Sequence, residues 1–288
     1  MNPKFLGAIP YTGSKQTLLS DLLPLFPDDV DTFYDVFCGG LSVSLSVGHN
    51  VVALDIESPL IDMYNMLRSK KDIAFIQDVI KQYGLTNDDP EPYNSLRDEY
   101  NRSKNPEHLY TLLMFAFCNM YRTNKKGGFN TPFGNNRFRG NRGGYKDVWN
   151  ERFQILKNKS NLKIINAPYN SIDPHAGDFV YCDPPYLITG AQYNSKWGKE
   201  GDINLYQWLD SLDAIGVKFG LSNVTHHAGK ENEILIEWMK KYNVHDLNKN
   251  YKMNQIKGVD NKETREVYVC NYKKESVNNS PISLDQFM

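Results

Sequence analysis

Hydrophobic residues follow two different patterns along this chain. Short runs rich in β-branched and aromatic residues occur toward both ends and predict buried strands. No convincing strand pattern occurs between residues 58 and 161. Within that region, residues 75–83 and 92–100 carry apolar side chains at helical spacing, and residues 109–120 form a strongly apolar segment that predicts a core helix. The pattern therefore predicts an α/β protein with an inserted, mainly helical region.

The other predicted elements alternate along the chain. Strands are predicted at residues 32–37, 51–55, 162–167, 178–182, 217–222 and 266–272, the last as a hairpin partner at the edge of the sheet. Helices are predicted at residues 16–25, 41–45, 59–67 and 231–241. This order predicts one domain made of residues 1–57 and 162–275, an insertion at residues 58–161, and a polar, loosely held tail at residues 276–288.

The composition is that of an ordinary globular protein, with 40% hydrophobic and 23% charged residues among 288. No apolar run approaches the roughly 20 residues that span a bilayer, and the N-terminus lacks the pattern of a signal peptide. The four cysteines lie far apart in the sequence and include no C-x-x-C pair: Cys38, Cys118, Cys182 and Cys270. We therefore expect neither a zinc site nor disulfides, and we expect the protein to be in a reducing cytoplasm. We interpret Cys182 as a buried strand residue rather than a nucleophile. We interpret the adjacent His226 and His227 as surface or capping residues, since adjacent side chains do not face one metal site.

Positive charge is concentrated in one segment, although the net charge is only −1. Between residues 122 and 163 there are eleven lysines and arginines against two acidic residues. Residues 121–145 are rich in Gly, Asn and Arg and contain aromatic side chains, which is typical of a disordered loop but also of a loop that reads a nucleic-acid groove. A solvated surface is the alternative. We favour a polyanionic partner because the excess of charge is so local.

An acid, two prolines and a tyrosine follow the predicted strand at residues 178–182. Pro184 and Pro185 lack backbone N–H groups, so the strand must end there, with Asp183 at its carboxyl end. The Asp183 carboxylate and the Pro184 carbonyl are two acceptors that can hold an –NH2 group, and Tyr186 can stack on the ring that carries it. This arrangement suits alkylation of the exocyclic amine of a nucleobase. The alternative is a strand that ends at a proline turn, with a helix-capping Asp.

Three weaker signals lie nearer the N-terminus. The predicted strand at 32–37 is followed by Gly39 and Gly40, which let the backbone approach a ligand closely, as in the first turn of a nucleotide-binding βαβ unit. The next strand ends at Asp55, an acid that in such units commonly binds ribose hydroxyls, with a cap on the following helix as the alternative. The Gly-Ser-Lys turn at 13–15 can hold an anion or carboxylate, although it lacks the spacing of a P-loop.

Taken together, five stretches resemble the α group of the Dam family of DNA adenine methyltransferases, and their sequences are most similar to those of the members from T-even bacteriophages. The order of donor motif, basic insertion and Asp-Pro-Pro-Tyr is that of this group, and the resemblance covers nearly the whole chain except its C-terminal end. The stretches are Tyr-Thr-Gly-Ser-Lys at 11–15, Asp-Val-Phe-Cys-Gly-Gly-Leu-Ser-Val-Ser-Leu at 35–45, Thr-Pro-Phe-Gly at 131–134, Gly-Asp-Phe-Val-Tyr-Cys-Asp-Pro-Pro-Tyr-Leu-Ile-Thr at 177–189 and Lys-Phe-Gly-Leu-Ser-Asn-Val at 218–224.

The resemblance implies a Rossmann-like methyltransferase sheet, S-adenosyl-L-methionine as methyl donor without a metal, and adenine in double-stranded DNA as acceptor. It implies that the flipped adenine is held by Asp183, Pro184 and Tyr186. It implies a donor site that contains Tyr11, Lys15, Phe37, Gly39, Gly40, Asp55 and Asp183. The insertion would be the target-recognition domain, and the implied DNA contacts are Lys15, Phe117, Cys118, Asn119, Met120, Tyr121, Arg122, Asn124, Pro132 and Arg137.

The resembling enzymes usually methylate GATC, but this chain departs from their pattern at two places. Asn135 and Asn136 stand where phage members carry basic residues, and Cys118 stands where a small hydroxyl residue is expected. The fine sequence preference therefore stays open. The resemblance also implies no membrane association, a monomer or weak dimer on DNA, and the cytoplasm of a bacterium or a phage-infected cell. Two other classes remain open: a methyltransferase for RNA adenine or protein glutamine, and a DNA-binding module without activity.

Overall fold

The computed structural model describes residues 6–134, 145–189, 197–247 and 264–273. The chain divides into two compact units. The first contains residues 1–16, 38–45 and 55–167, and the second contains residues 17–37, 46–54 and 168–288. The predicted insertion at 58–161 thus falls within the first unit, together with the N-terminal segment and the glycine turn.

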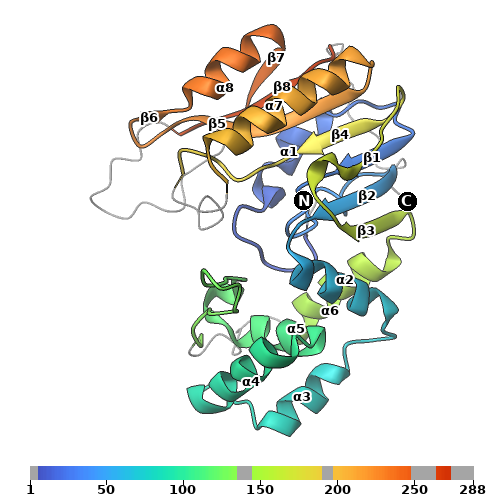
Figure 1. Ribbon diagram of the computed structural model, residues 1–288. Helices are drawn as coiled ribbons and strands as arrows, with labels where there is room; N and C mark the ends of the chain where they lie inside the picture. Colours follow the sequence, from blue (N-terminus) through green and yellow to red (C-terminus); the bar gives the residue numbers. More distant parts are fainter. Residues whose placement is uncertain (1–5, 135–144, 190–196, 248–263, 274–288) are drawn as a thin grey trace. The chain divides into compact units, whose positions relative to one another are not determined.

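The second unit is built on a mixed β-sheet (Figure 1). Its strands lie in the order β2-β1-β4-β5-β8-β7, and β6 pairs with the end of β5. Strands β2, β1, β4 and β5 are parallel, whereas β8 is antiparallel to both β5 and β7. The predicted α/β sheet is confirmed. The bounds are Thr32–Asp35 for β1, Asn50–Asp55 for β2, Phe179–Cys182 for β4, Lys218–His227 for β5, Lys230–Glu231 for β6, Asn243–Leu247 for β7 and Arg265–Cys270 for β8.

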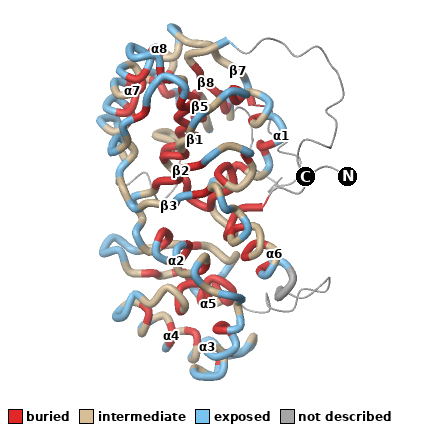
Figure 2. Tube along the Cα trace, turned by 90° about the vertical axis from the view of Figure 1, so that its right-hand side faces the viewer, coloured by how far each residue is buried: buried red, intermediate tan, exposed pale blue. Residues whose placement is uncertain are grey.

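Aromatic side chains cover one face of this sheet. Because alternate residues of a strand point to the same face, Phe179 and Tyr181 of β4 lie on one side together. Phe26, which precedes β1, packs on Phe33, Phe179 and Tyr181 with ring centroids 5.3, 5.4 and 5.2 Å apart. All four rings are buried, and strands β4, β5 and β8 are buried throughout most of their length (Figure 2).

The opposite face is covered by helices α7 (Lys199–Ala214) and α8 (Glu233–Trp238), with a 3₁₀-helix at Met239–Lys241 continuing α8. Both helices pack on β5 and on each other. Phe219 pairs with Val180, so it points away from the Phe26 side, and its ring lies 6.0 Å from Trp238. Trp238 in turn stacks on Tyr206 of α7 at 4.6 Å.

The first unit is mainly helical. Its helices are α2 (Ser58–Ser69), α3 (Phe75–Tyr83), α4 (Pro90–Ser103), α5 (Pro106–Phe115) and α6 (Tyr145–Asn158), and it also contains strand β3 (Leu162–Asn166). Helix α5 is the core element: every residue from 108 to 115 is buried, and α2, α3 and α4 all pack against it. No strand occurs between residues 58 and 134 or between 145 and 161.

Local sequence explains where α4 and α5 begin. Asp89 and Asn105 accept hydrogen bonds from backbone N–H groups of the first turns, at 3.0 and 2.9 Å. Pro90 and Pro106 follow them as the first helical residues, where proline needs no intrahelical partner.

Three predicted helices differ from the structure. Helix α5 ends at Phe115 rather than at residue 120, because Ala116 is extended, with φ −70° and ψ 149°. Cys118 and Asn119 then adopt positive φ angles of 56° and 53°, which a right-handed helix cannot contain. Residues 41–45 form turns rather than a helix, and Leu41 has a φ of 62°. The predicted helix at 16–25 is divided into α1 (Leu19–Leu22) between 3₁₀-helices at Lys15–Thr17 and Leu23–Leu25.

Five features of the strands and helices were missed or misplaced. Helices α6 and α7 were not predicted. Strand β5 extends beyond residue 222 to His227. Strand β8 lies between β5 and β7 rather than at the sheet edge, because the edge position belongs to β7, which was not predicted. The β7 sequence Asn-Val-His-Asp-Leu has only one buried residue, so it lacks the apolar pattern of a strand.

Candidate active site

Strands β1 and β4 end beside each other at one edge of the second unit's sheet (Figure 1). Asp35 pairs with Tyr181 in parallel register, and the Val36 N–H donates to the Tyr181 carbonyl at 3.1 Å. Because β1 lies between β2 and β4, the strand order reverses here. Open α/β sheets bind ligands outside the carboxyl ends of their strands at such a reversal. Phe37 follows β1 and Asp183 follows β4 at this edge.

Asp183, Pro184 and Tyr186 form a tight turn directly after β4. Pro184 is buried, and Asp183 and Tyr186 are half-buried. The Tyr186 hydroxyl lies 2.9 Å from Asp183 Oδ1 and 2.9 Å from Glu266 Oε1. The Thr189 N–H and hydroxyl both donate to the Tyr186 carbonyl, at 3.2 and 3.1 Å, and hold the turn closed. Burial, followed by the nearby Asp183 and Glu266 carboxylates, raises the pKa of Tyr186 well above its usual range.

Glu266 was missed by sequence reasoning. It occupies β8, is only 4% exposed and brings a second carboxylate to the turn. Its signal was available in principle: an acidic residue stands beside the uninterrupted apolar run that follows it in the same strand. Buried acids of this kind are uncommon unless they have a polar partner.

The alternative of a helix-capping Asp183 finds no support. No helix begins within residues 184–189, and α7, which begins at Lys199, has Gly198 as its N-cap without a side-chain bond.

Phe37 belongs to an aromatic cluster in the second unit. Its ring stacks on Tyr169 at 5.4 Å and meets Trp197 edge to face at 5.5 Å. Trp197 is fixed by Asp202, which accepts its indole N–H at 2.7 Å. The cluster thus provides a wall of flat rings held by a buried carboxylate.

The glycine turn lies in the first unit and is shaped by Tyr11. Gly39 has a φ of 42°, which glycine adopts without strain. A Cβ at Gly39 would lie 2.7 Å from Tyr11 Cε1, and one at Gly40 would lie 2.6 Å from Tyr11 Cβ. The Ala8 N–H donates to the Gly40 carbonyl at 2.9 Å and ties the N-terminal segment to the turn. Tyr11, Gly39 and Gly40 are therefore brought together.

Asp55, the last residue of β2, bridges the glycine turn and the entry of α2. Its Oδ2 accepts the Gly39 N–H and its Oδ1 accepts the Glu57 N–H, each at 3.0 Å. Tyr64 of α2 donates to the Gly39 carbonyl at 2.8 Å from the other side. Burial raises the pKa of Asp55 despite these two backbone donors. The N-cap of α2 is Glu57, so Asp55 supports the start of the helix without capping it.

Lys15 is buried, in the 3₁₀-helix Lys15–Thr17 of the first unit's N-terminal segment. The Ser14 N–H donates to the Tyr11 carbonyl at 3.1 Å and forms the turn that precedes it.

Residues 115–134 form a compact antiparallel ribbon in the first unit, and it contains all the DNA-contact candidates except Lys15 and Arg137. Residue Arg137 lies outside the described residues. Phe117, Asn124 and Pro132 are exposed. Tyr121 is buried, and its hydroxyl donates to a Glu57 carboxylate oxygen at 3.4 Å. The ribbon is held by backbone bonds from Gly134 to Phe115, Phe117 to Pro132, Asn130 to Arg122 and Asn124 to Gly128, at 2.8, 2.9, 3.0 and 2.8 Å.

The sharp bend at the end of α5 is formed by Cys118 and Asn119. The Asn119 amide donates to the carbonyls of Leu113 and Met114, at 2.9 and 3.1 Å, and so closes the helix end. Met120 follows, and its carbonyl accepts the Thr131 hydroxyl at 2.8 Å. The polar head of Asn119 is therefore committed to the fold, while the bend leaves Phe117 exposed.

The described residues contain no group of three or more His, Cys, Asp or Glu side chains that could hold a metal ion. His226 lies 3.4 Å from Glu231, whereas His227 contacts the Thr264 hydroxyl at 2.8 Å. Cys182 is buried in β4, as predicted, and burial raises the pKa of its thiol. Among the helices of the described residues, none is long and apolar enough to cross a bilayer.

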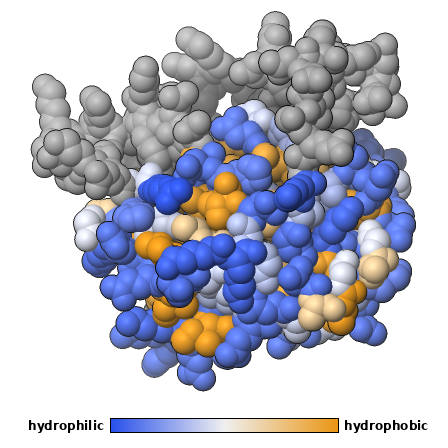
Figure 3. Space-filling model, turned by 90° about the horizontal axis from the view of Figure 1, so that it is seen from above, coloured by the Kyte–Doolittle hydropathy of each residue, from blue (hydrophilic) through white to orange (hydrophobic). Residues whose placement is uncertain are grey.

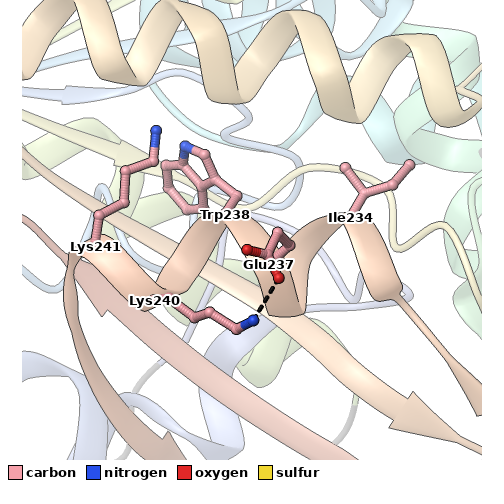
Figure 4. Close-up of a pocket in the computed structure, with 5 residues that line it drawn as sticks. All are labelled: Ile234, Glu237, Trp238, Lys240 and Lys241. Carbon is pink, nitrogen blue, oxygen red and sulfur yellow. Dashed lines mark hydrogen bonds and ion pairs between the residues drawn. The ribbon is translucent and has the colours of Figure 1, made fainter.

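A surface pocket of about 650 Å³ lies beside α8 and the turn that follows it (Figure 4). Glu237 and Lys240 form an ion pair at its rim. The face seen in Figure 3 carries hydrophobic side chains in small patches among hydrophilic ones. The other lining residues are Ile234, Trp238 and Lys241. None of the catalytic, donor-binding or DNA-binding residues predicted from the sequence lines this pocket.

Comparison with known proteins gives consistent matches. The model of the D12 class N6 adenine-specific DNA methyltransferases matches residues 11–253. The chain is 36% identical to the type II methyltransferase M.FokI of Planomicrobium okeanokoites over 278 residues, which cover 91% of this chain and 42% of that protein. It is 32% identical to the modification methylase StsI of Streptococcus sanguinis over 288 residues, 93% of this chain and 43% of that protein. A DNA adenine methylase of Vibrio cholerae is 29% identical over 202 residues, 65% of this chain and 68% of that protein.

The chain spans less than half the length of the first two relatives, but the family model covers most of the chain itself. The mixed sheet, the glycine turn after β1 and the Asp-Pro-Pro-Tyr turn after β4 all lie within the matched segment. The methyltransferase fold predicted from the sequence is therefore confirmed. The chain belongs to the D12 class N6 adenine-specific DNA methyltransferase family.

Proposed function

We propose that this chain transfers a methyl group from S-adenosyl-L-methionine to the exocyclic amino group of an adenine in double-stranded DNA. The observation that carries the proposal is the turn of Asp183 and Pro184 at the carboxyl end of β4, in a chain of an adenine methyltransferase family. Because the chain covers only part of M.FokI and StsI, the activity of the whole protein is part of the proposal.

The second unit supplies the acceptor side. The adenine amine carries two hydrogens, and the Asp183 carboxylate and Pro184 carbonyl offer two acceptors for them. Holding both hydrogens turns the nitrogen lone pair out of the ring system and toward the methyl group. The Asp183 carboxylate also stabilises the positive charge that develops on the nitrogen as it attacks. The ring of Tyr186 stacks on the base.

Five residues that the resemblance assigns to the methyl donor belong to the first unit: Tyr11, Lys15, Gly39, Gly40 and Asp55. The glycine turn offers backbone without side chains, because Tyr11 occupies the space that a Cβ would need. The Asp55 carboxylate has about four lone-pair sites, so it can accept from ribose hydroxyls as well as from its two backbone donors. Buried Lys15 suits a carboxylate. These residues fit S-adenosyl-L-methionine, which when bound would supply an electrophilic methyl group on a sulfonium centre.

The 115–134 ribbon supplies the DNA contacts, and the predicted insertion at 58–161 acts as the target-recognition domain. Exposed Phe117 and Pro132 provide apolar contacts, and Arg122 provides a guanidinium for guanine. The target adenine must leave the base stack, which costs a few kcal/mol. Basic side chains between residues 122 and 163 offset this cost by neutralising phosphates, so binding weakens steeply with salt.

Finer features of the proposal follow from the resemblance to T-even phage members. These are GATC as the target sequence, a monomer or weak dimer on DNA, and a cytoplasmic location. StsI is a modification methylase and M.FokI is a type II methyltransferase, which supports a role in marking DNA for a restriction–modification system.

The test is transfer of labelled methyl groups to a GATC duplex by the whole chain, with RNA and protein acceptors in parallel. Asp183→Ala should lower transfer to the duplex by about 100-fold or more, the size of effect seen when a transition-state contact is lost. The matched control is Asp173→Ala, an exposed carboxylate in the same unit, which should leave transfer unchanged. Near wild-type transfer by Asp183→Ala would contradict the assigned role.

The remaining outcomes separate the other classes. Label in RNA or protein but not in DNA favours a different acceptor, and donor binding without any transfer favours a binding module. Sequencing host DNA for modified bases after expression reports both the base and its context, and a context other than GATC would replace the proposed target.

A further inference from the structure

Glu266 faces the proposed catalytic turn from a strand that the family motif does not include. The turn leaves β4, whereas Glu266 is in β8, which is separated from β4 by β5. Even so, the Tyr186 hydroxyl lies 2.9 Å from Glu266 Oε1, the same distance as from Asp183 Oδ1. Glu266 is 4% exposed and Tyr186 is half-buried, so this contact is partly shielded from water.

The hydrogens available at this phenol are limited. A tyrosine hydroxyl carries a single hydrogen, and an ionised carboxylate can only accept. The two carboxylates therefore compete for one hydrogen. Burial raises the pKa of Tyr186, so the phenol keeps that hydrogen. When the hydrogen points to Asp183, it binds Oδ1 and weakens that oxygen as an acceptor for the adenine amine, although the carboxylate has further lone pairs.

We propose that Glu266 is a positioning residue that draws the hydroxyl hydrogen of Tyr186 away from Asp183, so that Asp183 Oδ1 is a stronger acceptor for the substrate amine. The proposal rests on the proposed function. Charge-assisted hydrogen bonds are roughly twice as strong as neutral ones, so only a charged acceptor at position 266 competes evenly with Asp183. A neutral acceptor there would lose the hydrogen to Asp183.

The decisive variant is Glu266→Gln, which keeps the shape and removes the charge. It should lower kcat for duplex methylation by about tenfold, equivalent to about 1.4 kcal/mol, with the KM for the methyl donor unchanged. The matched control is Asp246→Asn, which removes a carboxylate from the neighbouring strand β7, where it pairs with exposed Arg265. That variant should keep the wild-type kcat. Circular dichroism and thermal unfolding check that each variant is folded.

A second background separates positioning from a general structural role. Tyr186→Phe keeps the aromatic ring and removes the hydroxyl hydrogen for which the two carboxylates compete. In the Tyr186→Phe background, Glu266→Gln should therefore change kcat by less than about twofold. This double-mutant cycle measures the coupling between the two contacting residues. An equal loss in both backgrounds would overturn the proposal, as would an unchanged kcat in the single variant.

The phenol can also be observed without turnover. The difference Raman spectrum between wild type and Tyr186→Phe isolates this one hydroxyl and reports whether it mainly donates or accepts. The same difference is then taken between Glu266→Gln and the double variant Glu266→Gln with Tyr186→Phe. The two difference spectra should differ, and identical spectra would overturn the inference. If the wild-type chain failed to methylate adenine, the proposed function would fail, while the spectrum would still decide the direction of the hydrogen.

Discussion

Asn130 accepts two hydrogen bonds from one edge of the Arg122 guanidinium, the edge formed by Nε and Nη2. Arg122 Nε donates to Asn130 Oδ1 at 2.9 Å, and Arg122 Nη2 donates to the Asn130 carbonyl at 2.8 Å. The backbone adds a third bond, from the Asn130 N–H to the Arg122 carbonyl at 3.0 Å. Since the guanidinium is planar and rigid, this contact fixes its plane. The hydrogens on Nη1 and on the outer side of Nη2 point away from Asn130, in the geometry that pairs with guanine O6 and N7.

Asn130→Ala should therefore weaken specific DNA binding more than general DNA binding. It removes one of the two acceptors that orient Arg122, and the expected loss on the preferred duplex is about 1 kcal/mol, or several-fold in affinity. Fluorescence anisotropy at fixed salt measures the effect on preferred and unrelated duplexes. Lys126→Ala is the control: it removes an exposed charge from the same ribbon and should weaken binding to both duplexes and lower the salt slope. Equal losses for Asn130→Ala on both duplexes would rule out the orienting role.

Gly39→Ala should reduce affinity for the methyl donor. The new Cβ would lie 2.7 Å from Tyr11 Cε1, so either the ring or the turn must move. Overpacking of this kind typically costs about 1–3 kcal/mol. Gly84→Ala is a matched control, because Gly84 also has a positive φ, of 67°, but has no atom within 4 Å of the added Cβ. Calorimetric titration should show lost affinity for the first variant only, and unchanged affinity in Gly39→Ala would remove the glycine turn from the donor site.

Asp202→Ala should destabilise the second unit much more than Asp210→Ala. Each carboxylate accepts from a tryptophan, a tyrosine and a third donor, but Asp202 is fully buried whereas 35% of the Asp210 side chain is exposed. Each buried donor left unpaired costs about 1–3 kcal/mol, so Asp202→Ala should cost about 3–5 kcal/mol, against about 1 kcal/mol at the exposed Asp210. Urea unfolding followed by tryptophan fluorescence measures both. Equal costs would mean that water reaches the Asp202 network. The donors are Trp197, Tyr206 and Asn232 for Asp202, and Trp238, Tyr242 and Lys241 for Asp210.

His108 should make the first unit less stable in acid. Burial lowers the pKa of His108 in the folded chain, so the unfolded chain binds the proton more tightly. This contribution to stability is complete above the ordinary pKa of about 6.5 and is lost as the pH falls toward the folded-state value. His108→Phe keeps the edge-to-face contact with Tyr83, whose ring lies at 5.4 Å, and removes the titration. Urea midpoints at about pH 8 and about pH 5 should fall less in the variant than in the wild type; parallel falls would exclude His108.

The sequence predicted those elements whose hydrophobic pattern is local. Helix α3 has the predicted bounds, 75–83, because a single amphipathic stripe between polar ends defines it. Strands β1, β2 and β4 were found because each is an apolar run that ends at an acid, a glycine or a proline. The Asp183 turn followed directly, since Pro184 cannot continue a ladder.

The remaining features depend on contacts between distant residues. Strand β7 exists because β8 offers it an unpaired edge, and its own residues carry little apolar signal. The early end of α5 depends on Asn119, whose amide binds two carbonyls of the helix it terminates. Glu266 approaches Tyr186 across 80 residues of sequence, a relationship that no local spacing can reveal. Sequence patterns therefore identified the motifs but not the residues that orient them.

The late position of β8 in the chain has a consequence for synthesis. The sheet joins strands from near residue 32 to strands that end at residue 270, and β8 fills the gap between β5 and β7. A nascent polypeptide lacks both this filling strand and its glutamate until translation has passed residue 270. We expect ribosome-bound fragments that stop earlier to expose unsatisfied strand edges and therefore to bind chaperones.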